Sequence, residues 1–286
     1  MQAKTTTLSA GTWDSWVSDN FGPFQQSWQY GQSSGCRVSR VDILDNGKRV
    51  GVAQLLQRKV LGLPVSAIQG GPVWDRSISL EKRRLPPRLG RRIFLQTPGA
   101  GDKLNGIPLA RSPTVARWDL TGNAEDLRAR MHQKWRNRLV VAERQGITMR
   151  NSSDLRWILQ KENLNRQEKG YRGLPNTFIH NVCRNQRNWC LFVALSEGAR
   201  IAAALFLRHG TAATYQIGWN GSQGRRLNAH NLVFWHAAKS LAAHGVNWVD
   251  LGVVDTKRAP GLARFKLGTG ATKVRFGHTG LPMTYL

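Results

Sequence analysis

The pattern of apolar and polar residues predicts two halves of the chain that each contain a β-hairpin. In the first half, residues 36–44 alternate apolar and polar side chains, the turn Asp45-Asn46-Gly47 follows, and residues 49–60 return with the same alternation. A further strand at 63–68 leads into the turn Gly70-Gly71-Pro72-Val73-Trp74-Asp75. In the second half we expect strands at 115–120, 189–195, 200–209 and 211–217, and helices at 123–145 and 153–167.

The segment 211–270 has the richest pattern in the chain. A strand is followed by a polar loop and then by an amphipathic helix for which Asn228 is the expected N-cap. Gly245 ends this helix, residues 247–254 alternate as a half-buried strand, and a basic loop then leads to a corner at Arg264-Phe265-Lys266. The start of the helix offers free backbone N–H groups beside Arg225 and Arg226, which favours phosphate binding.

The net charge narrows the possible partners. The 286 residues contain 42 Lys and Arg against 17 Asp and Glu, a net charge of +25 that is spread through the expected helices and strands. Such an excess predicts salt-sensitive binding to a polyanion, and we favour nucleic acid over an anionic membrane surface. We find no membrane-spanning stretch and no apolar signal core, and the three cysteines have no metal-site spacing, so we expect a cytoplasmic protein with structural thiols.

The familiar motifs of nucleophilic and metal catalysis are missing. There is no G-x-S-x-G, H-E-x-x-H, Cys-x-x-Cys or Walker sequence, and His230 and His236 fall on different faces of one expected helix. We therefore expect neither a metal nor a cofactor. An enzyme of this kind can still transfer an acyl group that arrives activated, provided that it positions the reactants and stabilises an oxyanion.

The order Tyr215, Asn228, Gly245, Asp250-Leu251-Gly252, Gly261-Leu262 and Phe265-Lys266 resembles the C-terminal half of the Fem-type aminoacyl-tRNA-dependent transferases. Residues 26–31, the 70–75 turn and residues 134–147 also resemble the family, but less specifically. The resemblance implies an α/β protein with two GNAT-like domains in tandem, each a mixed sheet flanked by helices, the first being shortened. We expect the first domain at 1–112, completed by 274–286, and the second, which carries the donor site, at 113–273.

The resemblance also implies roles for particular residues. Lys266 matches a lysine that stabilises the oxyanion or the terminal ribose, and Phe265 matches an aromatic residue that packs the terminal nucleoside of the tRNA. Asp75 matches an aspartate near the acceptor that orients or deprotonates the amine, although it could instead cap its turn; the general base is not assigned. The other expected substrate contacts are Tyr215, Arg172, Gln32, Phe178, Trp74 and Asn228.

A basic face on the 123–145 helix and two basic loops are the expected tRNA contacts. They comprise Arg128, Lys134, Arg136, Arg138, Arg225, Arg226, Lys257, Arg258 and Arg264. A solvated helix face without a partner is the competing interpretation for the helix.

Departures from the family pattern lie on the acceptor side. Gln32 stands where muropeptide-linking enzymes of the family carry lysine, Leu174 and Phe178 replace an arginine and a tyrosine, and Ile217 replaces a second tyrosine. We therefore expect an aminoacyl-tRNA-dependent aminoacyltransferase that forms an amide bond with an amine on a peptide natural-product intermediate or a carrier-bound peptide, with a carrier protein as a possible partner. Two domains in one chain make a monomer sufficient, and the sequence leaves the oligomeric state open. Three other functions stay open: a peptidoglycan-precursor bridge aminoacyltransferase, an acyl-CoA-dependent GNAT N-acyltransferase, and a non-catalytic RNA-binding protein.

Overall fold

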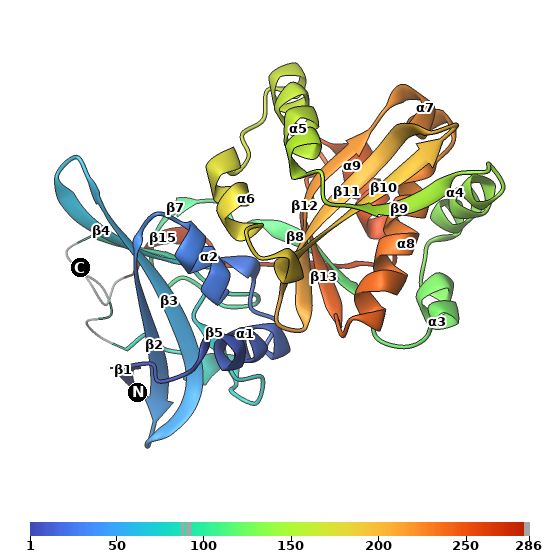
Figure 1. The fold of residues 1–286 in the computed structure, drawn as a ribbon. Coiled ribbons are helices and arrows are strands. Elements are labelled where there is room, and N and C mark those ends of the chain that lie inside the picture. Colours follow the sequence, from blue (N-terminus) through green and yellow to red (C-terminus); the bar gives the residue numbers. More distant parts are fainter. Residues whose placement is uncertain (87–88, 90–92, 283–286) are drawn as a thin grey trace. The chain divides into compact units, whose positions relative to one another are not determined.

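The computed structural model describes residues 1–86, 89 and 93–282, and the chain divides into two compact units (Figure 1). Unit 1 comprises Met1–Val115 and Val274–Leu286, and unit 2 comprises Ala116–Lys273. From the sequence we expected domain boundaries after residue 112 and after residue 273. In the structure the chain divides after Val115 and after Lys273. Each unit is built around one sheet.

In its described residues, unit 1 contains a mixed sheet and two short α-helices, and its principal hairpin is the one predicted from the sequence. The turn places Asn46 at φ 49° and Gly47 at φ 79°, the left-handed pair that tight hairpin turns require. The helices are α1 (Ala10–Asp19) and α2 (Trp28–Ser33), and Trp13 and Val17 of α1 are fully buried. The strands run in the order β1 (Gln2–Thr5), β2 (Arg37–Asp45), β3 (Lys48–Val60), β4 (Leu63–Gln69), β6 (Ile93–Thr97), β15 (Thr279–Pro282) and β7 (Gly106–Ala110), with β5 (Val73–Trp74) paired to β3.

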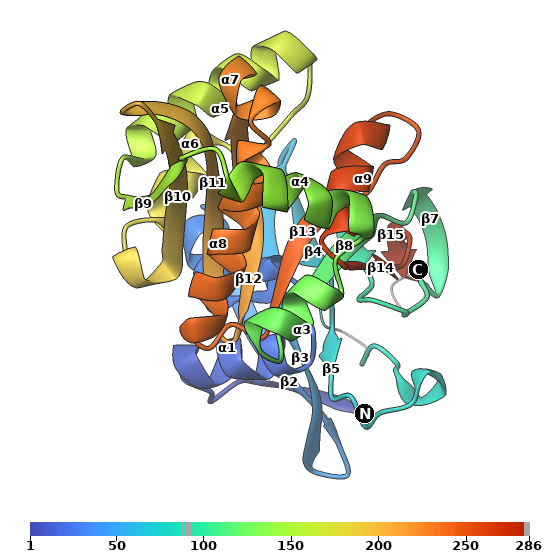
Figure 2. The same ribbon diagram turned by 90° about the vertical axis from the view of Figure 1, so that its right-hand side faces the viewer.

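Unit 2 contains a sheet of seven strands with helices on both faces. Its strand order is β14 (Thr272–Arg275), β8 (Thr114–Asp119), β13 (Trp248–Val253), β12 (Ala212–Asn220), β11 (Ala199–His209), β10 (Trp189–Ser196) and β9 (Thr148–Ser152). The helices α4 (Gln133–Glu143) and α8 (Ala229–Ala243) lie on one face, and α5 (Leu155–Lys169) and α6 (Asn176–Val182) on the other (Figure 2). Between the sheet and α8 lies a core that includes Trp118, Phe206 and Phe234.

The helix expected at 123–145 is interrupted, so that prediction of one continuous helix was wrong. Asn123 starts α3 (Ala124–Ala129) with a capping box that includes Asp126, but α3 ends before His132, and α4 begins after it. The backbone N–H of His132 donates to the carbonyl of Gly268 at 3.0 Å instead of continuing the helix. Trp135 packs directly against Gly268. A Cβ at residue 268 would lie only 2.6 Å from the indole Cδ1, so no larger residue fits there without a shift.

Two further predictions for the 211–270 segment were wrong in detail. The polar loop is a short helix, α7 (Ser222–Arg226). Asn228 is the N-cap residue of α8, as predicted, but it has a left-handed backbone (φ 52°) and makes no side-chain capping hydrogen bond. The corner at Arg264-Phe265-Lys266 is part of a helix, α9 (Pro260–Gly268), with Pro260 in its first turn. Proline suits that position because its fixed φ is helical and its missing N–H would have had no partner.

Candidate active site

The strands β12 and β13 run parallel but separate soon after they begin. Their registered pairs are limited to residues 212–214 against 248–250, whereas β12 continues to Asn220 and β13 to Val253. A bulge lies at the same place, because Phe206 of β11 pairs with Tyr215 and Leu205 pairs with Ile217. Gln216 is therefore the extra residue of β12, and a bulge re-aims side chains beside the point where the strands part. We call this point the β12–β13 opening.

Lys266 reaches the end of β13 at this opening. Its side chain is buried, with 6% of the residue exposed, and its Nζ donates a hydrogen bond to the carbonyl oxygen of Val253 at 2.9 Å. Gly252, at φ 77°, makes room for it, since a Cβ at that residue would lie 3.4 Å from Nζ. Burial lowers the pKa of the Lys266 ammonium to about 8, and the charge of Asp250 partly opposes this shift. Lys266 can therefore carry a positive charge at neutral pH with little water around it.

Asp250 interacts electrostatically with Lys266 and also with Arg117, and we selected neither Asp250 nor Arg117 as a site residue from the sequence. Asp250 on β13 accepts a 2.7 Å hydrogen bond from the backbone N–H of Gly252, and burial raises the pKa of its carboxyl while Arg117 and Lys266 lower it. Arg117 comes from β8, the strand beside β13, and its guanidinium lies 4.9 Å from the centre of the Trp248 ring. The sequence did contain a signal for Asp250, because an acidic residue within an otherwise apolar strand is unusual and indicates a functional position.

Phe265, the neighbour of Lys266, packs into an aromatic cluster. Its ring centre lies 4.8 Å from that of Phe234, 5.3 Å from that of His230 and 5.9 Å from that of Trp135. Tyr215 joins the same cluster through Phe234, at 4.9 Å. The structure thus brings Phe265, Lys266 and Tyr215 into one region. Burial lowers the pKa of His230 to about 4, so its imidazole is neutral, and its buried Nε2 has no hydrogen-bond partner.

The hydroxyl of Tyr215 lies over Gly218, where a Cβ would occupy its place. Burial and the charge of Glu162 raise the pKa of Tyr215, so this phenol stays protonated. Glu162 itself is buried and accepts hydrogen bonds from Arg166 Nε at 2.9 Å and from the Tyr171 hydroxyl at 2.8 Å. The Tyr215 hydroxyl can donate a hydrogen bond to a substrate or orient it, but a protonated phenol cannot act as a base.

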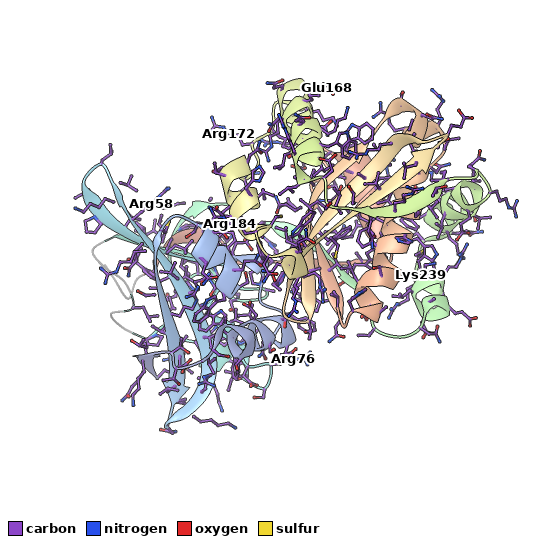
Figure 3. The ribbon with its side chains drawn as sticks, viewed as in Figure 1. Arg58, Arg76, Glu168, Arg172, Arg184 and Lys239 are labelled. Atoms are coloured by element: carbon purple, nitrogen blue, oxygen red, sulfur yellow. The ribbon has the colours of Figure 1, made fainter. Side chains whose placement is uncertain are left out.

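The remaining predicted substrate contacts of unit 2 have different environments. Arg172 is exposed after α5 (Figure 3), whereas Phe178 is buried in α6 with 7% of the residue exposed. Asn228 is half-buried between α7 and α8. Their roles toward a substrate stay predictions.

Most of the predicted tRNA contacts are exposed cations. Arg128 differs from the others because both of its terminal nitrogens pair with the Glu143 carboxylate, at 2.9 and 2.6 Å. Arg225 donates to the carbonyl of Asn220 at 2.7 Å. Arg136 is half-buried on α4, a helix that packs against α9. The exposed residues are Lys134 and Arg138 on α4, Arg225 and Arg226 on α7, Lys257 and Arg258 before α9, and Arg264 on it.

Two of the predicted residues of unit 1, Trp74 and Asp75, lie at the end of β5 and in the turn that follows it. Asp75 accepts from the backbone N–H of Ser77 at 2.9 Å and from its hydroxyl at 2.6 Å, and these bonds lower the pKa of the carboxyl. This is the turn-capping geometry; a role in orienting an amine is untested. Trp74 is buried, and Gln32 is exposed on α2.

Unit 1 also holds a cavity of about 190 Å³ that we did not anticipate from the sequence. Trp74 lines it together with Arg76, whose guanidinium lies 4.8 Å from the centre of the Phe21 ring. Arg83 and Asp102 form a 2.8 Å ion pair in its wall. The cavity therefore combines aromatic surface with one exposed cation.

Within the described residues, no cluster of His, Cys, Asp and Glu side chains could hold a metal ion. None of the helices described for this chain is both long and apolar enough to cross a membrane. The three cysteines are free thiols, and burial raises the pKa of Cys183 and Cys190, which disfavours their reactive thiolate forms.

Comparison with known proteins identifies the fold around this opening. The family model described as an acetyltransferase (GNAT) domain matches residues 126–271. No curated protein matches the sequence. The crystal structure of FemX is similar over 96% of both chains, with a TM-score of 0.72 and 14% sequence identity.

Two other solved structures share the fold at low sequence identity. A conserved protein of unknown function from Bacteroides thetaiotaomicron is similar over 98% of this chain and all of that one, with a TM-score of 0.62 and 10% identity. The C-terminal domain of a putative lysylphosphatidylglycerol synthetase from Agrobacterium fabrum is similar over 96% and 92% of the two chains, with a TM-score of 0.52 and 14% identity. The predicted α/β fold class, with GNAT-like architecture, is confirmed. The chain belongs to the acetyltransferase (GNAT) domain family and is an acyltransferase with the fold of FemX.

Proposed function

We propose that this acyltransferase takes its acyl group from an aminoacyl-tRNA and forms an amide bond with an amine on a peptide acceptor. The observation that carries the proposal is the buried Lys266 ammonium at the β12–β13 opening, held by a single hydrogen bond to Val253. A cation in a water-poor site interacts strongly with negative charge that develops during a reaction.

The reaction requires three events at the ester of the charged tRNA. The acceptor amine attacks the ester carbonyl, the carbonyl oxygen becomes an oxyanion, and the ribose hydroxyl leaves with a proton as the amide forms. We assign stabilisation of the oxyanion to Lys266. The acceptor must give up a proton, and we assign no base for that step. His230, with its low pKa, and Tyr215, with its raised pKa, are both poorly suited to it.

The backbone before α8 favours a tRNA donor over an acyl-CoA. A pyrophosphate cradle needs free backbone N–H groups, but those of Arg225, Leu227 and Asn228 already donate to carbonyl oxygens of Gly221, Gln223 and Arg225. In addition, unit 2 contains 25 Lys and Arg against 10 Asp and Glu. A polynucleotide accounts for this charge better than a single cofactor-sized anion does. The proposed donor implies a cytoplasmic enzyme.

The second candidate is an acyl-CoA-dependent N-acyltransferase, which the match to the acetyltransferase (GNAT) domain model favours. Lys266 could stabilise the corresponding oxyanion in that reaction. The two candidate functions therefore differ in the acyl donor and not in the catalytic residue. On the acceptor side, a peptide natural-product intermediate or carrier-bound peptide remains our first choice over a peptidoglycan precursor, because Gln32 and Phe178 replace the family's charged and hydroxyl-bearing residues.

The test is transfer of radiolabel from a mixed pool of aminoacyl-tRNAs to pooled peptide amines, with an RNase-treated arm and an acetyl-CoA arm. We expect RNase-sensitive labelling by the wild type that falls on the order of 100-fold in Lys266→Met. Arg156→Gln, an exposed cation on α5, is the matched control and should retain activity. RNase-insensitive transfer from acetyl-CoA would replace the proposed donor with acyl-CoA.

A further inference from the structure

The β3–β4 hairpin of unit 1 extends past the strands on both of its sides (Figure 1). On one side, β2 begins with Arg37 opposite Gln57 of β3. On the other side, β6 begins with Ile93 opposite Val65 of β4. Among the residues that the structure describes, 58–64 therefore form a two-stranded projection, closed by the Val60–Leu63 pair. We call residues 58–64 the hairpin tip.

The end of the hairpin tip is apolar and exposed. Leu61 is 98% exposed, Leu63 is 52% exposed and Val60 is 39% exposed. A projecting two-stranded hairpin gains nothing from such side chains in water, since they have no core to pack against.

The backbone of the tip does not call for leucine either. Leu61 has φ 50° and Gly62 has φ 79°, the left-handed pair that favours Asn-Gly in a tight turn. The same sheet uses Asn46-Gly47 for this purpose at the β2–β3 turn, with φ values of 49° and 79°. A leucine in this conformation is costly for the backbone, so neither local geometry nor core packing explains Leu61.

Cations lie directly behind the apolar end. Arg58 (labelled in Figure 3) and Lys59 are exposed on β3, and Arg37 is exposed where β2 begins. The sequence contains no Asp or Glu between Asn46 and Trp74, so no acid on either strand of this hairpin neutralises them. Leucines in front of a basic collar have the composition of segments that insert into the surface of an anionic bilayer.

We propose that the hairpin tip docks this enzyme on an anionic lipid bilayer, with Leu61 and Leu63 entering the acyl boundary and Arg58, Lys59 and Arg37 contacting the phosphates. RNA would account for the cations but leaves the exposed leucines without a role. This peripheral contact requires no membrane-spanning segment and goes beyond the proposed transfer reaction. Its test does not depend on that reaction.

The experiment is flotation of RNase-treated protein with vesicles of equal parts phosphatidylglycerol and phosphatidylcholine, compared with pure phosphatidylcholine. We expect the wild type to float with the anionic vesicles only. Leu61→Asp combined with Leu63→Asp should reduce the partition coefficient at least 10-fold. Arg58→Gln combined with Lys59→Gln should reduce it by about 5-fold for each charge removed. Leu164→Asp changes a leucine on α5 that is 58% exposed, close to the value for Leu63; it is the control and should float like the wild type.

Circular dichroism and thermal melting of each variant separate a binding defect from misfolding, and Leu61→Ser provides a milder change that tests the same side chain. Failure of the wild type to float, or flotation that is unaffected by both leucine changes, would overturn the proposal. Sedimentation that shows a dimer lost in the leucine variants, without vesicle binding by the wild type, would assign the tip to self-association instead.

Discussion

Replacement of Lys266 by methionine should make the protein more stable and at the same time inactive. The pKa of the buried ammonium is about 8 instead of 10.5, a difference of about 2.5 units. Each unit corresponds to about 1.4 kcal/mol, so the charged form costs the folded protein about 3 kcal/mol near pH 7. Methionine keeps a similar shape but loses the hydrogen bond to Val253, worth about 1.5 kcal/mol. We therefore expect a net gain of about 1–2 kcal/mol in the free energy of unfolding.

The pH dependence of this gain tests its cause. An unfolded lysine keeps its proton up to about pH 10.5, whereas the folded protein releases the Lys266 proton near pH 8. Between these values the unfolded state binds more protons, so the stability of the wild type rises with pH. The advantage of Lys266→Met should therefore shrink between pH 8 and pH 10.5. Urea unfolding at a series of pH values, followed by circular dichroism, measures both proteins under identical conditions.

Three results would refute this reasoning. If Lys266→Met is less stable than the wild type at pH 7, Lys266 is a structural anchor for the end of β13 and not a strained catalytic cation. If the variant is more stable by the same amount at every pH, the gain comes from packing. Full transfer activity in the variant would also remove Lys266 from the reaction.

Three other predictions follow from the structure. If the Lys266 ammonium is needed, the rate of transfer should fall as pH rises through about 8, and a pH–rate profile should lose this descending limb in Lys266→Met. Arg138→Gln should lower the slope of log affinity for tRNA against log salt concentration by about 0.9, measured by filter binding. Arg128→Gln should change this slope less, because Glu143 already pairs with that side chain, and equal slopes for the two variants would argue against α4 as the RNA face. Gly218→Ala should cost about 1–3 kcal/mol of unfolding free energy because its Cβ displaces the Tyr215 hydroxyl, and addition of Tyr215→Phe should restore part of it; no recovery in thermal melts would contradict the contact.

The long strands were predictable from the sequence, whereas several short strands were not. β3 and β11 combine long runs of apolar residues with clear turns, and the Asn46-Gly47 pair fixes the first hairpin directly. Strands such as β7 and β14 are short, contain Gly, Pro or Lys, and are ordered by pairing with neighbours distant in the sequence. The local alternation of apolar and polar residues does not predict such strands, because their pairing depends on the rest of the folded sheet.

The candidate site was predictable only in part for a related reason. Phe265 and Lys266 were identified through a family resemblance, and the residue pattern alone described a corner where the structure has a helix. Two glycines in a nine-residue segment hid that helix, and Pro260 was its one clear start signal. Asp250 interacts with Arg117 because β8 and β13 are neighbours in the sheet, and it interacts with Lys266 because α9 returns to the end of β13; no local sequence pattern encodes either contact.

The most direct test of the central claim is competition for the donor site. Crosslinking of the wild type to a tRNA that carries a photoreactive aminoacyl group would be measured with excess acetyl-CoA, excess uncharged tRNA, or neither. The account predicts a crosslink in α9 or at the end of β13 that uncharged tRNA suppresses and acetyl-CoA does not. Suppression by acetyl-CoA at low concentration, with tRNA without effect, would contradict it and assign the β12–β13 opening to an acyl-CoA donor.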